Sequence, residues 1–140
     1  MTKRAVVVGY GHYLPERIVE NAEFESSLDT TDEWIRSRTG IEERYIACDG
    51  ESTFTMALEA ARKALDIARV APAQLDLIIV ATLTPDHAIP ATACQVQNAL
   101  GATKAAAFDL QAGCTGFIYG TAVASDSIKA GSIDRKSTRL

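Results

Sequence analysis

The residues in this sequence best suited to chemistry are its three cysteines, Cys48, Cys94 and Cys114. An odd number of cysteines with no C-x-x-C spacing argues against a disulfide framework or a structural zinc site, so each is considered as a thiol. Cys114 follows an apolar run at 105–110 and a small-residue turn, and it precedes a predicted helix. A helix N-terminus favours the thiolate, and a sharp turn presents the side chain. Cys114 is therefore a candidate nucleophile, although composition alone favours a buried structural cysteine.

Trp34 and Arg38 lie four residues apart in a predicted helix at 31–39. Thr30 followed by Glu33 fits a capping box, and a glycine follows the helix. Residues four apart share a helix face, so the two side chains are expected on one side of the helix. From its residue type alone, Trp34 would belong to the core.

The histidine and glycine motifs favour structural roles. His87 lies in the loop TPDHAIP, where a surface or interface histidine is preferred over a general base, and no spacing supports a metal site. Gly9 and Gly11 resemble the start of a dinucleotide fingerprint, but Leu14 stands at the third glycine position. We interpret the two glycines as turn residues and expect no metal.

The elements that must position these residues alternate between strands and helices. Near-continuous apolar runs predict buried strands, and apolar residues at three- and four-residue spacing predict helices. This alternation predicts an α/β fold with a largely parallel sheet. In the last helix, Gly116 and Gly120 form a face that another element can approach closely. The predicted strands are 4–9, 75–82 and 105–110, and the predicted helices are 31–39, 52–68, 90–100 and 114–130.

The end of the sequence departs from this pattern. After Ile133 an α/β fold calls for another apolar strand, whereas residues 134–140 are polar or charged except for the last. We therefore expect 1–133 to form the folded part and 134–140 to be a tail foreign to the fold, through truncation or a sequence artefact. A natural disordered terminus is the alternative. A missing strand leaves an exposed sheet edge.

Length and composition limit the function classes. A chain of 140 residues with 47% hydrophobic and 23% charged content can bury the core of one domain. The net charge of -4 gives no electrostatic reason to expect a nucleic acid or membrane surface as partner. The apolar run at 5–8 is too short for a signal peptide, and no run approaches the roughly 20 apolar residues of a membrane span. We expect a cytoplasmic protein.

Four ordered motifs carry a resemblance to a known family. From Ala5 to Ile133 the sequence resembles β-ketoacyl-carrier-protein synthase III, through GYGHYLPERIVEN, DTTDEWIRSRTGIEER, DLIIVATLTPDHAIPATACQVQNALG and AFDLQAGCTGFIYG. The resemblance implies a thiolase-like layered αβαβα fold, of which most of the N-terminal half is present, and a homodimer. It also implies fatty-acid initiation: Cys114 accepts an acyl group from a coenzyme A thioester, which is a substrate rather than a cofactor, and the acyl group condenses with malonyl carrier protein.

The resemblance further assigns site residues. It implies that Trp34 stacks on the adenine of coenzyme A, that Thr30 and Arg38 contact the nucleotide, and that Ile89 reaches across the dimer into the partner's acyl channel. Cys48 and Cys94 are interpreted as structural. The family's His, Asn and second nucleotide-binding Arg match no position here. Two alternatives stay open: a relative that loads starters for polyketide, quinolone or long-chain ketone synthesis, and a non-catalytic fragment. We expect the 140 residues alone to be inactive.

Overall fold

The computed structural model describes residues 4–133 and 137–139. The chain forms two compact units, a smaller one at Leu14–Glu51 and a larger one made of the remainder. Within the described ranges, no helix has the length and apolar character needed to cross a membrane.

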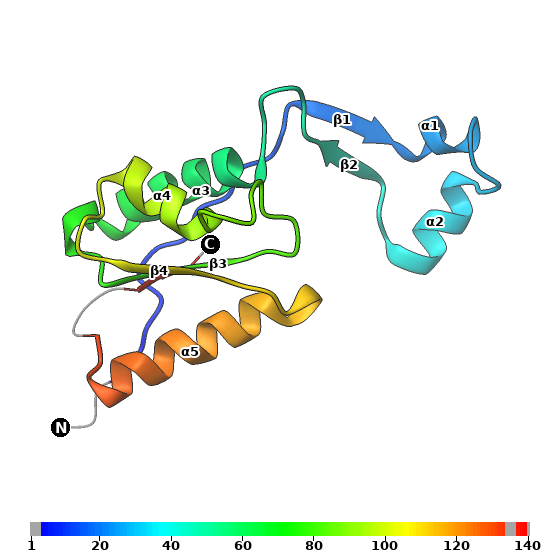
Figure 1. Cartoon of the computed structure of the whole chain (residues 1–140). Helices are drawn as coiled ribbons and strands as arrows, with labels where there is room; N and C mark the ends of the chain where they lie inside the picture. Colours follow the sequence, from blue (N-terminus) through cyan, green and yellow to red (C-terminus); the bar gives the residue numbers. More distant parts are fainter. Residues whose placement is uncertain (1–3, 134–136, 140) are drawn as a thin grey trace. The chain divides into compact units, whose positions relative to one another are not determined.

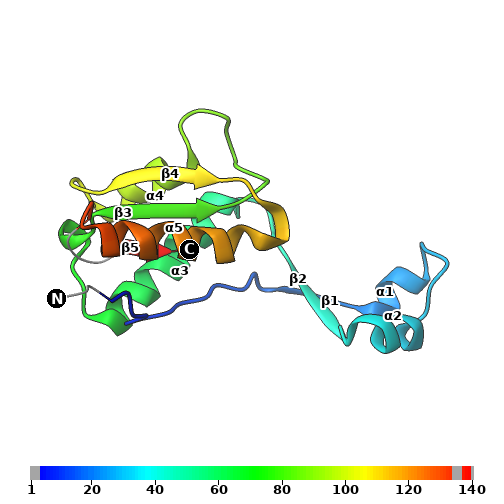
Figure 2. The ribbon, with the colours of Figure 1, turned by 90° about the horizontal axis from the view of Figure 1, so that it is seen from below.

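The larger unit is built on a three-stranded sheet with the order β4 (Ala106–Leu110), β3 (Leu77–Ala81) and β5 (Ser137–Arg139). Both ladders are parallel, with Leu77 opposite Ala106 on one side and opposite Ser137 on the other. Figure 2 shows β3 and β4 side by side and pointing the same way. The sequence therefore predicted the parallel sheet correctly.

Helices cover both faces of this sheet (Figure 1): α3 (Thr53–Ala68) and α4 (Thr92–Leu100) lie on one face and α5 (Gly116–Ala130) on the other. Successive side chains of a strand point to opposite faces. Accordingly, Ile78 and Val80 of β3 join the core under α3 and α4, whereas Leu77 and Ile79 pack with Ala124 of α5. Burial on both faces explains why β3 is a continuous apolar run.

The ends of the helices follow from local sequence. Ser52 caps α3, and its hydroxyl accepts a hydrogen bond from the N–H of Thr55 while Thr55 reciprocates, which makes a capping box. Gly101 ends α4 in the left-handed conformation that glycine adopts without strain. A one-turn 3-10 helix, η1 (Pro72–Gln74), leads into β3. The predicted helices at 52–68 and 90–100 are thus confirmed to within two residues.

The glycine face of α5 packs on β3, as its spacing predicted. Gly116 and Gly120 are both buried. A Cβ added to Gly116 would lie 3.0 Å from the Cβ of Ala81, which is tighter than ordinary contact. The absence of a side chain at Gly116 therefore lets the helix approach the strand closely, whereas a Cβ at Gly120 would make ordinary contact with Ile79 at 3.7 Å.

The smaller unit contains an antiparallel pair, β1 (Arg17–Glu20) and β2 (Glu43–Ile46), with α1 (Asn21–Glu25) and α2 (Asp32–Thr39) between them. Of these four elements, the sequence predicted α2 alone. The strands are four residues long and largely exposed, so they lack the apolar run that signals a buried strand.

Two predictions about boundaries are wrong, the strand at 4–9 and the start of the last helix. The segment 4–9 is not a strand: it pairs with no strand in the described part of the chain, and Gly9 lies against the α3 backbone so closely that no side chain would fit. β-branched residues favour a strand but do not supply a ladder partner. In the predicted tail, Ser137–Arg139 pairs with β3, and residues 134–136 and 140 lie outside the described residues. The prediction that 134–140 is a non-native or truncated tail stays a prediction. The last helix begins at Gly116 instead of Cys114.

Candidate active site

Cys114 lies in η2 (Gly113–Thr115), a single 3-10 turn between the end of β4 and the start of α5. Gly113 has a φ of +54°, a conformation that L residues rarely adopt, and this residue turns the chain directly before the cysteine. The hydroxyl of Thr115 donates to the carbonyl of Ala112 at 2.7 Å and closes the turn. Cys114 itself is exposed. The prediction that Cys114 lies in a sharp turn between a strand and a helix is confirmed. Because its thiol is exposed, Cys114 is not a buried structural cysteine in this fold.

The N-terminal end of α5 directly follows the thiol. A helix start carries backbone N–H groups that have no intrahelical acceptor, together with the positive end of the helix dipole. Such donors stabilise negative charge on a sulfur or on a carbonyl oxygen that is being attacked. The chemistry that this arrangement supports is nucleophilic attack by a thiolate.

A carboxylate connects β4, the strand that leads to Cys114, to the neighbouring helix α4. Both oxygens of Asp109 on β4 accept hydrogen bonds from backbone N–H groups at the start of α4, from Thr92 and from Ala93, each at 2.8 Å. Asp109 thereby caps a helix that is remote in sequence. No local motif signals such a contact, and the sequence did not predict it.

A second carboxylate fixes the loop before α4 in the same way. Asp86 accepts hydrogen bonds from the N–H groups of Thr53 at 3.0 Å and Phe54 at 2.9 Å, at the start of α3. Thr53 also donates its hydroxyl to the carbonyl of Thr84 at 2.7 Å. Partial burial raises the pKa of Asp86, but the hydrogen bonds from Ser52, Phe54 and Thr53 outweigh it, so the pKa lies below its usual value.

The loop held by Asp86 carries Ile89 and His87 on its surface. The side chain of Ile89 is 89% exposed, and His87 is exposed as well. Ile89 is the most exposed large apolar residue in the part of the chain that the structure describes. The position of His87 fits the predicted surface histidine.

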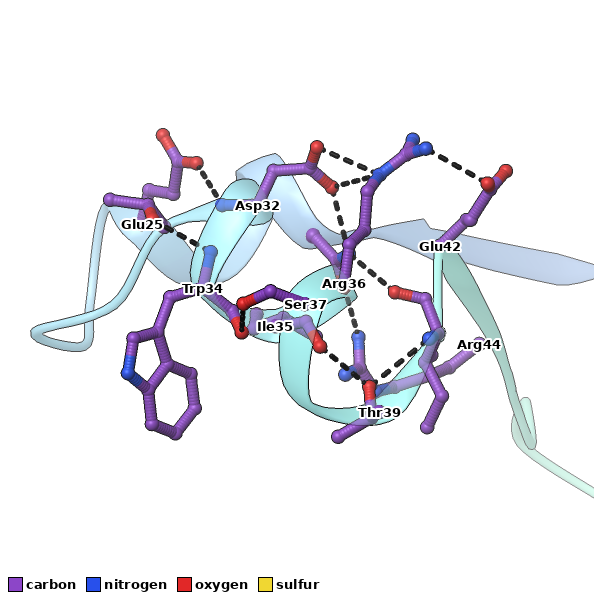
Figure 3. Close-up of polar contacts among 12 residues, drawn as sticks. Glu25, Asp32, Trp34, Ile35, Arg36, Ser37, Thr39, Glu42 and Arg44 are labelled. Carbon is purple, nitrogen blue, oxygen red and sulfur yellow. Dashed lines mark hydrogen bonds and ion pairs between the residues drawn. The ribbon is translucent and has the colours of Figure 1, made fainter.

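Trp34 and Arg38 share an exposed side of α2, as their spacing predicted. The guanidinium carbon of Arg38 lies 5.4 Å from the centre of the Trp34 ring. The Trp34 side chain is 55% exposed, so it is not a core residue. In Figure 3 its indole points away from the polar contacts that Asp32, Arg36 and Glu42 make. An exposed indole beside a guanidinium suits a planar ligand with negative charge.

The cap of α2 differs by one residue from the prediction. Thr31 is the N-cap, and its hydroxyl accepts a hydrogen bond from the N–H of Trp34 at 3.1 Å. Gly40 ends the helix with a φ of +72°, as expected. The Thr30 hydroxyl oxygen is buried and has no hydrogen-bond partner among the residues that the structure describes.

The other cysteines lie elsewhere on the fold. Cys94 on α4 is half-buried, with its sulfur 3.6 Å from the carbonyl oxygen of Ala107. Cys48 is exposed in the smaller unit. Residues 4–133 and 137–139 hold no group of three or more His, Cys, Asp and Glu side chains arranged for a metal ion.

The larger unit also contains an apolar cavity of about 690 Å³. Its walls are the segment 4–11, α3, the end of β3 and Phe117. Cys114 is not among the lining residues. The cavity is therefore distinct from the exposed thiol.

The β-ketoacyl-acyl-carrier-protein synthase III of Rhodobacter capsulatus is 56% identical over 135 residues, which cover 96% of this chain and 42% of that protein. The structure of 3-oxoacyl-acyl-carrier-protein synthase III from Aquifex aeolicus superposes with a TM-score of 0.85 at 49% identity, covering 89% of this chain and 40% of the other. The chain is therefore similar to the N-terminal portion of synthase III proteins.

The similarity to synthase III structures also identifies the fold. The two units are a fragment of the mixed α/β thiolase-like fold, and the predicted fold class is confirmed. The priming β-ketosynthase of the R1128 polyketide pathway has a similar fold, with a TM-score of 0.87 at 38% identity over 95% of this chain and 40% of its own. No family model matches the chain. The chain spans 42% of the length of the first curated synthase III relatives.

Proposed function

We propose that this chain is the acyl-accepting part of a β-ketoacyl-acyl-carrier-protein synthase III, which condenses an acyl-coenzyme A starter with malonyl acyl carrier protein to initiate fatty-acid synthesis. The observation that carries the proposal is the exposed Cys114 thiol, in a turn between β4 and α5, in a chain similar to synthase III proteins. Within this proposal, residues 1–133 correspond to the N-terminal half of the fold. A cytoplasmic location belongs to the proposal, because both proposed substrates are cytoplasmic.

In the first proposed step, the Cys114 thiolate attacks the carbonyl carbon of the acyl-coenzyme A thioester. The tetrahedral intermediate carries negative charge on oxygen, which backbone N–H groups at the turn and the start of α5 stabilise. Its collapse breaks the bond to the coenzyme A sulfur, and coenzyme A leaves as its thiolate and takes up a proton. The acyl group is then joined to Cys114, which divides one difficult condensation into two easier steps.

In the second proposed step, malonyl carrier protein loses carbon dioxide and becomes a carbanion equivalent. Its carbon attacks the acyl carbonyl on Cys114, a carbon–carbon bond forms, and the cysteine thiolate leaves. The product is a β-ketoacyl carrier protein. The His and Asn that assist decarboxylation in similar enzymes have no matching position in this sequence, so they are not assigned.

Intact mass measurement tests the nucleophile. The full-length gene product is incubated with acetyl-coenzyme A, and we expect one acetyl adduct that is absent from Cys114→Ala. Cys48→Ala is the matched control, because its thiol is also exposed; this variant should retain the adduct. An adduct that survives in Cys114→Ala and disappears in Cys48→Ala contradicts the assignment. A folded full-length protein that forms no adduct supports the alternative of a non-catalytic protein.

We propose that Trp34 and Arg38 bind the nucleotide of coenzyme A, with Thr30 at the same site. The exposed indole and the nearby guanidinium support this role for Trp34 and Arg38. The buried hydroxyl of Thr30 gives that residue less support. Removing an aromatic platform costs about 1–3 kcal/mol for a stacked base, so Trp34→Ala should weaken coenzyme A binding about tenfold or more. An unchanged affinity in calorimetry excludes the proposed stacking.

We also propose a homodimer in which Ile89 lines the partner's acyl channel. The outer edge of β4 supports an association, because β4 is the end strand of its sheet and has β3 as its one neighbour among the described strands. Free strand edges readily pair with another chain. The exposure of Ile89 is consistent with a contact outside its own fold. Sedimentation equilibrium of the full-length gene product should give twice the chain mass, and a monomer at micromolar concentration contradicts the proposal.

The likeness to the priming β-ketosynthase favours a second candidate, a starter-loading enzyme of polyketide synthesis. Both candidates use the same cysteine acylation and differ in the acceptor. Turnover with malonyl carrier protein of fatty-acid synthesis supports the first candidate. Acylation of Cys114 followed by turnover with a polyketide carrier protein alone supports the second.

A further inference from the structure

Asn21 is a buried polar side chain at the point where β1 passes into α1. It is 1% exposed. Its amide nitrogen donates to Oδ1 of Asp32 and to the carbonyl oxygen of Ile41, each at 2.8 Å, and its oxygen accepts from Nη1 of Arg44 at 2.7 Å. Asp32 is the first residue of α2 and Ile41 follows its C-cap glycine. One side chain therefore holds both ends of the helix that carries Trp34 and Arg38.

The contacts of Asp32 extend this network along the helix. Its carboxylate accepts hydrogen bonds from Asn21 and from Nε of Arg36, and Arg36 also pairs with Glu42 at 2.8 Å. The backbone N–H of Asp32 donates to Oε1 of Glu25 at 2.7 Å. Figure 3 shows these contacts on the side of α2 away from the Trp34 indole. The Asn21 hydrogen bond, followed by the Arg36 hydrogen bond, lowers the pKa of Asp32, so its carboxylate stays ionised to a lower pH than an ordinary aspartate does.

Apolar packing alone gives α2 little support. Ile35 is the one residue of its eight that is buried. Most surface helices are held by an apolar stripe that spans several turns. Since α2 lacks such a stripe, its orientation depends on the polar contacts at its two ends. Asn21 is the buried centre of these contacts.

We propose that Asn21 is a positioning residue for coenzyme A recognition, which orients α2 so that Trp34 and Arg38 meet the nucleotide in a preformed arrangement. The inference rests on the proposed function, because it assumes that these two side chains bind coenzyme A. Asn21 acts through the helix and does not itself contact the ligand. Its replacement should therefore weaken coenzyme A binding while the chemistry at Cys114 is retained.

The test is Asn21→Asp in the full-length gene product. Aspartate has the same shape and keeps an acceptor for Arg44, but it replaces both donors and places a second carboxylate beside Asp32. We expect KM for acetyl-coenzyme A to rise about tenfold, with kcat and the KM for malonyl carrier protein within twofold of the unsubstituted protein. An unchanged KM for acetyl-coenzyme A overturns the proposal.

Val96→Ala is the matched destabilising control, because Val96 is fully buried in the core of the larger unit. Val96→Ala should lower the free energy of unfolding without raising KM for acetyl-coenzyme A. If KM rises equally in Val96→Ala and Asn21→Asp, the positioning role of Asn21 is overturned. In a protein that already carries Trp34→Ala, Asn21→Asp should raise KM for acetyl-coenzyme A less than a further twofold, because the two changes act through one helix. If the two substitutions raise KM independently, so that their fold-changes multiply, the proposal is overturned.

Calorimetry of coenzyme A binding separates this inference from the proposed function. The Cys114→Ala protein provides the binding assay, so catalysis is not needed. If Asn21→Asp leaves the affinity for coenzyme A unchanged, the inference is overturned. Acylation of Cys114 would still support the proposed function in that case. If Asn21→Asp does not fold, Asp32→Asn breaks the same network at the half-buried helix start, and unaltered coenzyme A binding in that variant overturns the inference.

Discussion

Oδ2 of Asp109 accepts a 2.8 Å hydrogen bond from the backbone N–H of Thr92, a residue 17 positions earlier in the chain. The strand that leads to Cys114 is thereby joined to the start of α4, where the loop that carries Ile89 ends. The capping carboxylate comes from a strand and not from the residue before the helix, since Ala91 has no side chain that can accept. The position of α4 and that of the cysteine turn are consequently linked by one side chain.

Asp109→Ala should destabilise the larger unit. The change leaves two backbone donors at the start of α4 without their charged acceptor, which costs about 2 kcal/mol or more in the free energy of unfolding. Urea denaturation followed by circular dichroism measures the change. Asp126→Ala is the control, because this α5 residue makes an exposed ion pair with Lys129, worth about 0.5 kcal/mol. Equal losses in the two variants contradict the capping role.

Asp86 should make stability depend on acid pH. Its pKa in the fold lies below the unfolded value, so its ionised form stabilises the fold above about pH 4 and this contribution is lost as the pH falls through the lower, folded pKa. Asp86→Asn should reduce stability at pH 7 and weaken the dependence below pH 4. The measurement is the urea midpoint of unfolding between pH 2.5 and 7. If the midpoints of Asp86→Asn and the unsubstituted protein change with pH in parallel, the role of Asp86 is contradicted.

Gly11→Ala should destabilise the packing of the N-terminal segment on α3. An added Cβ would overlap the carbonyl oxygen of Ala60, which belongs to the helix backbone and has little freedom to shift. Overpacking of this kind costs about 1–3 kcal/mol. The matched change Gly120→Ala meets Ile79 at an ordinary 3.7 Å, and in a helix it should be neutral or stabilising by about 0.5–1 kcal/mol. The measurement is the thermal unfolding temperature of each variant, which should be lower for Gly11→Ala than for Gly120→Ala. The reverse order would contradict the packing of Gly11 against α3.

Ile89→Phe should narrow the range of starters if Ile89 lines the proposed acyl channel. Added bulk excludes longer chains, and one or two methylene groups correspond to about a tenfold change in selectivity. The measurement is kcat/KM for acetyl- against butyryl-coenzyme A in the full-length gene product, whose ratio should shift about tenfold toward acetyl. Ile67→Phe, on an exposed site of α3, serves as control and should leave the ratio unchanged. If Ile89→Phe leaves this kcat/KM ratio unchanged, the proposal that Ile89 lines the acyl channel is contradicted.

The elements with strong local signals were predictable from the sequence. Helix α3 has a capping serine and regular apolar spacing, β3 is apolar because both of its faces are covered, and Cys114 follows a strand and a turn. These signals lie within a few residues of the features that they specify. The spacing of Trp34 and Arg38 likewise predicts a common helix face, which the structure confirms.

Tertiary structure decided what depends on partners far along the chain. The segment 4–9 has strand propensity, yet no ladder partner forms for it within the described residues, and Gly9 packs on α3 instead, as Gly11 does two residues later. Asp86, Asp109 and Asn21 have no local motif, because each one bonds to groups between 11 and 33 positions away. The sequence by itself determined the thiol, its turn and the helix faces, since propensity and periodicity act locally. The fold alone decided which carboxylates and amides hold those elements in place, because a hydrogen bond needs a partner that only folding brings within reach.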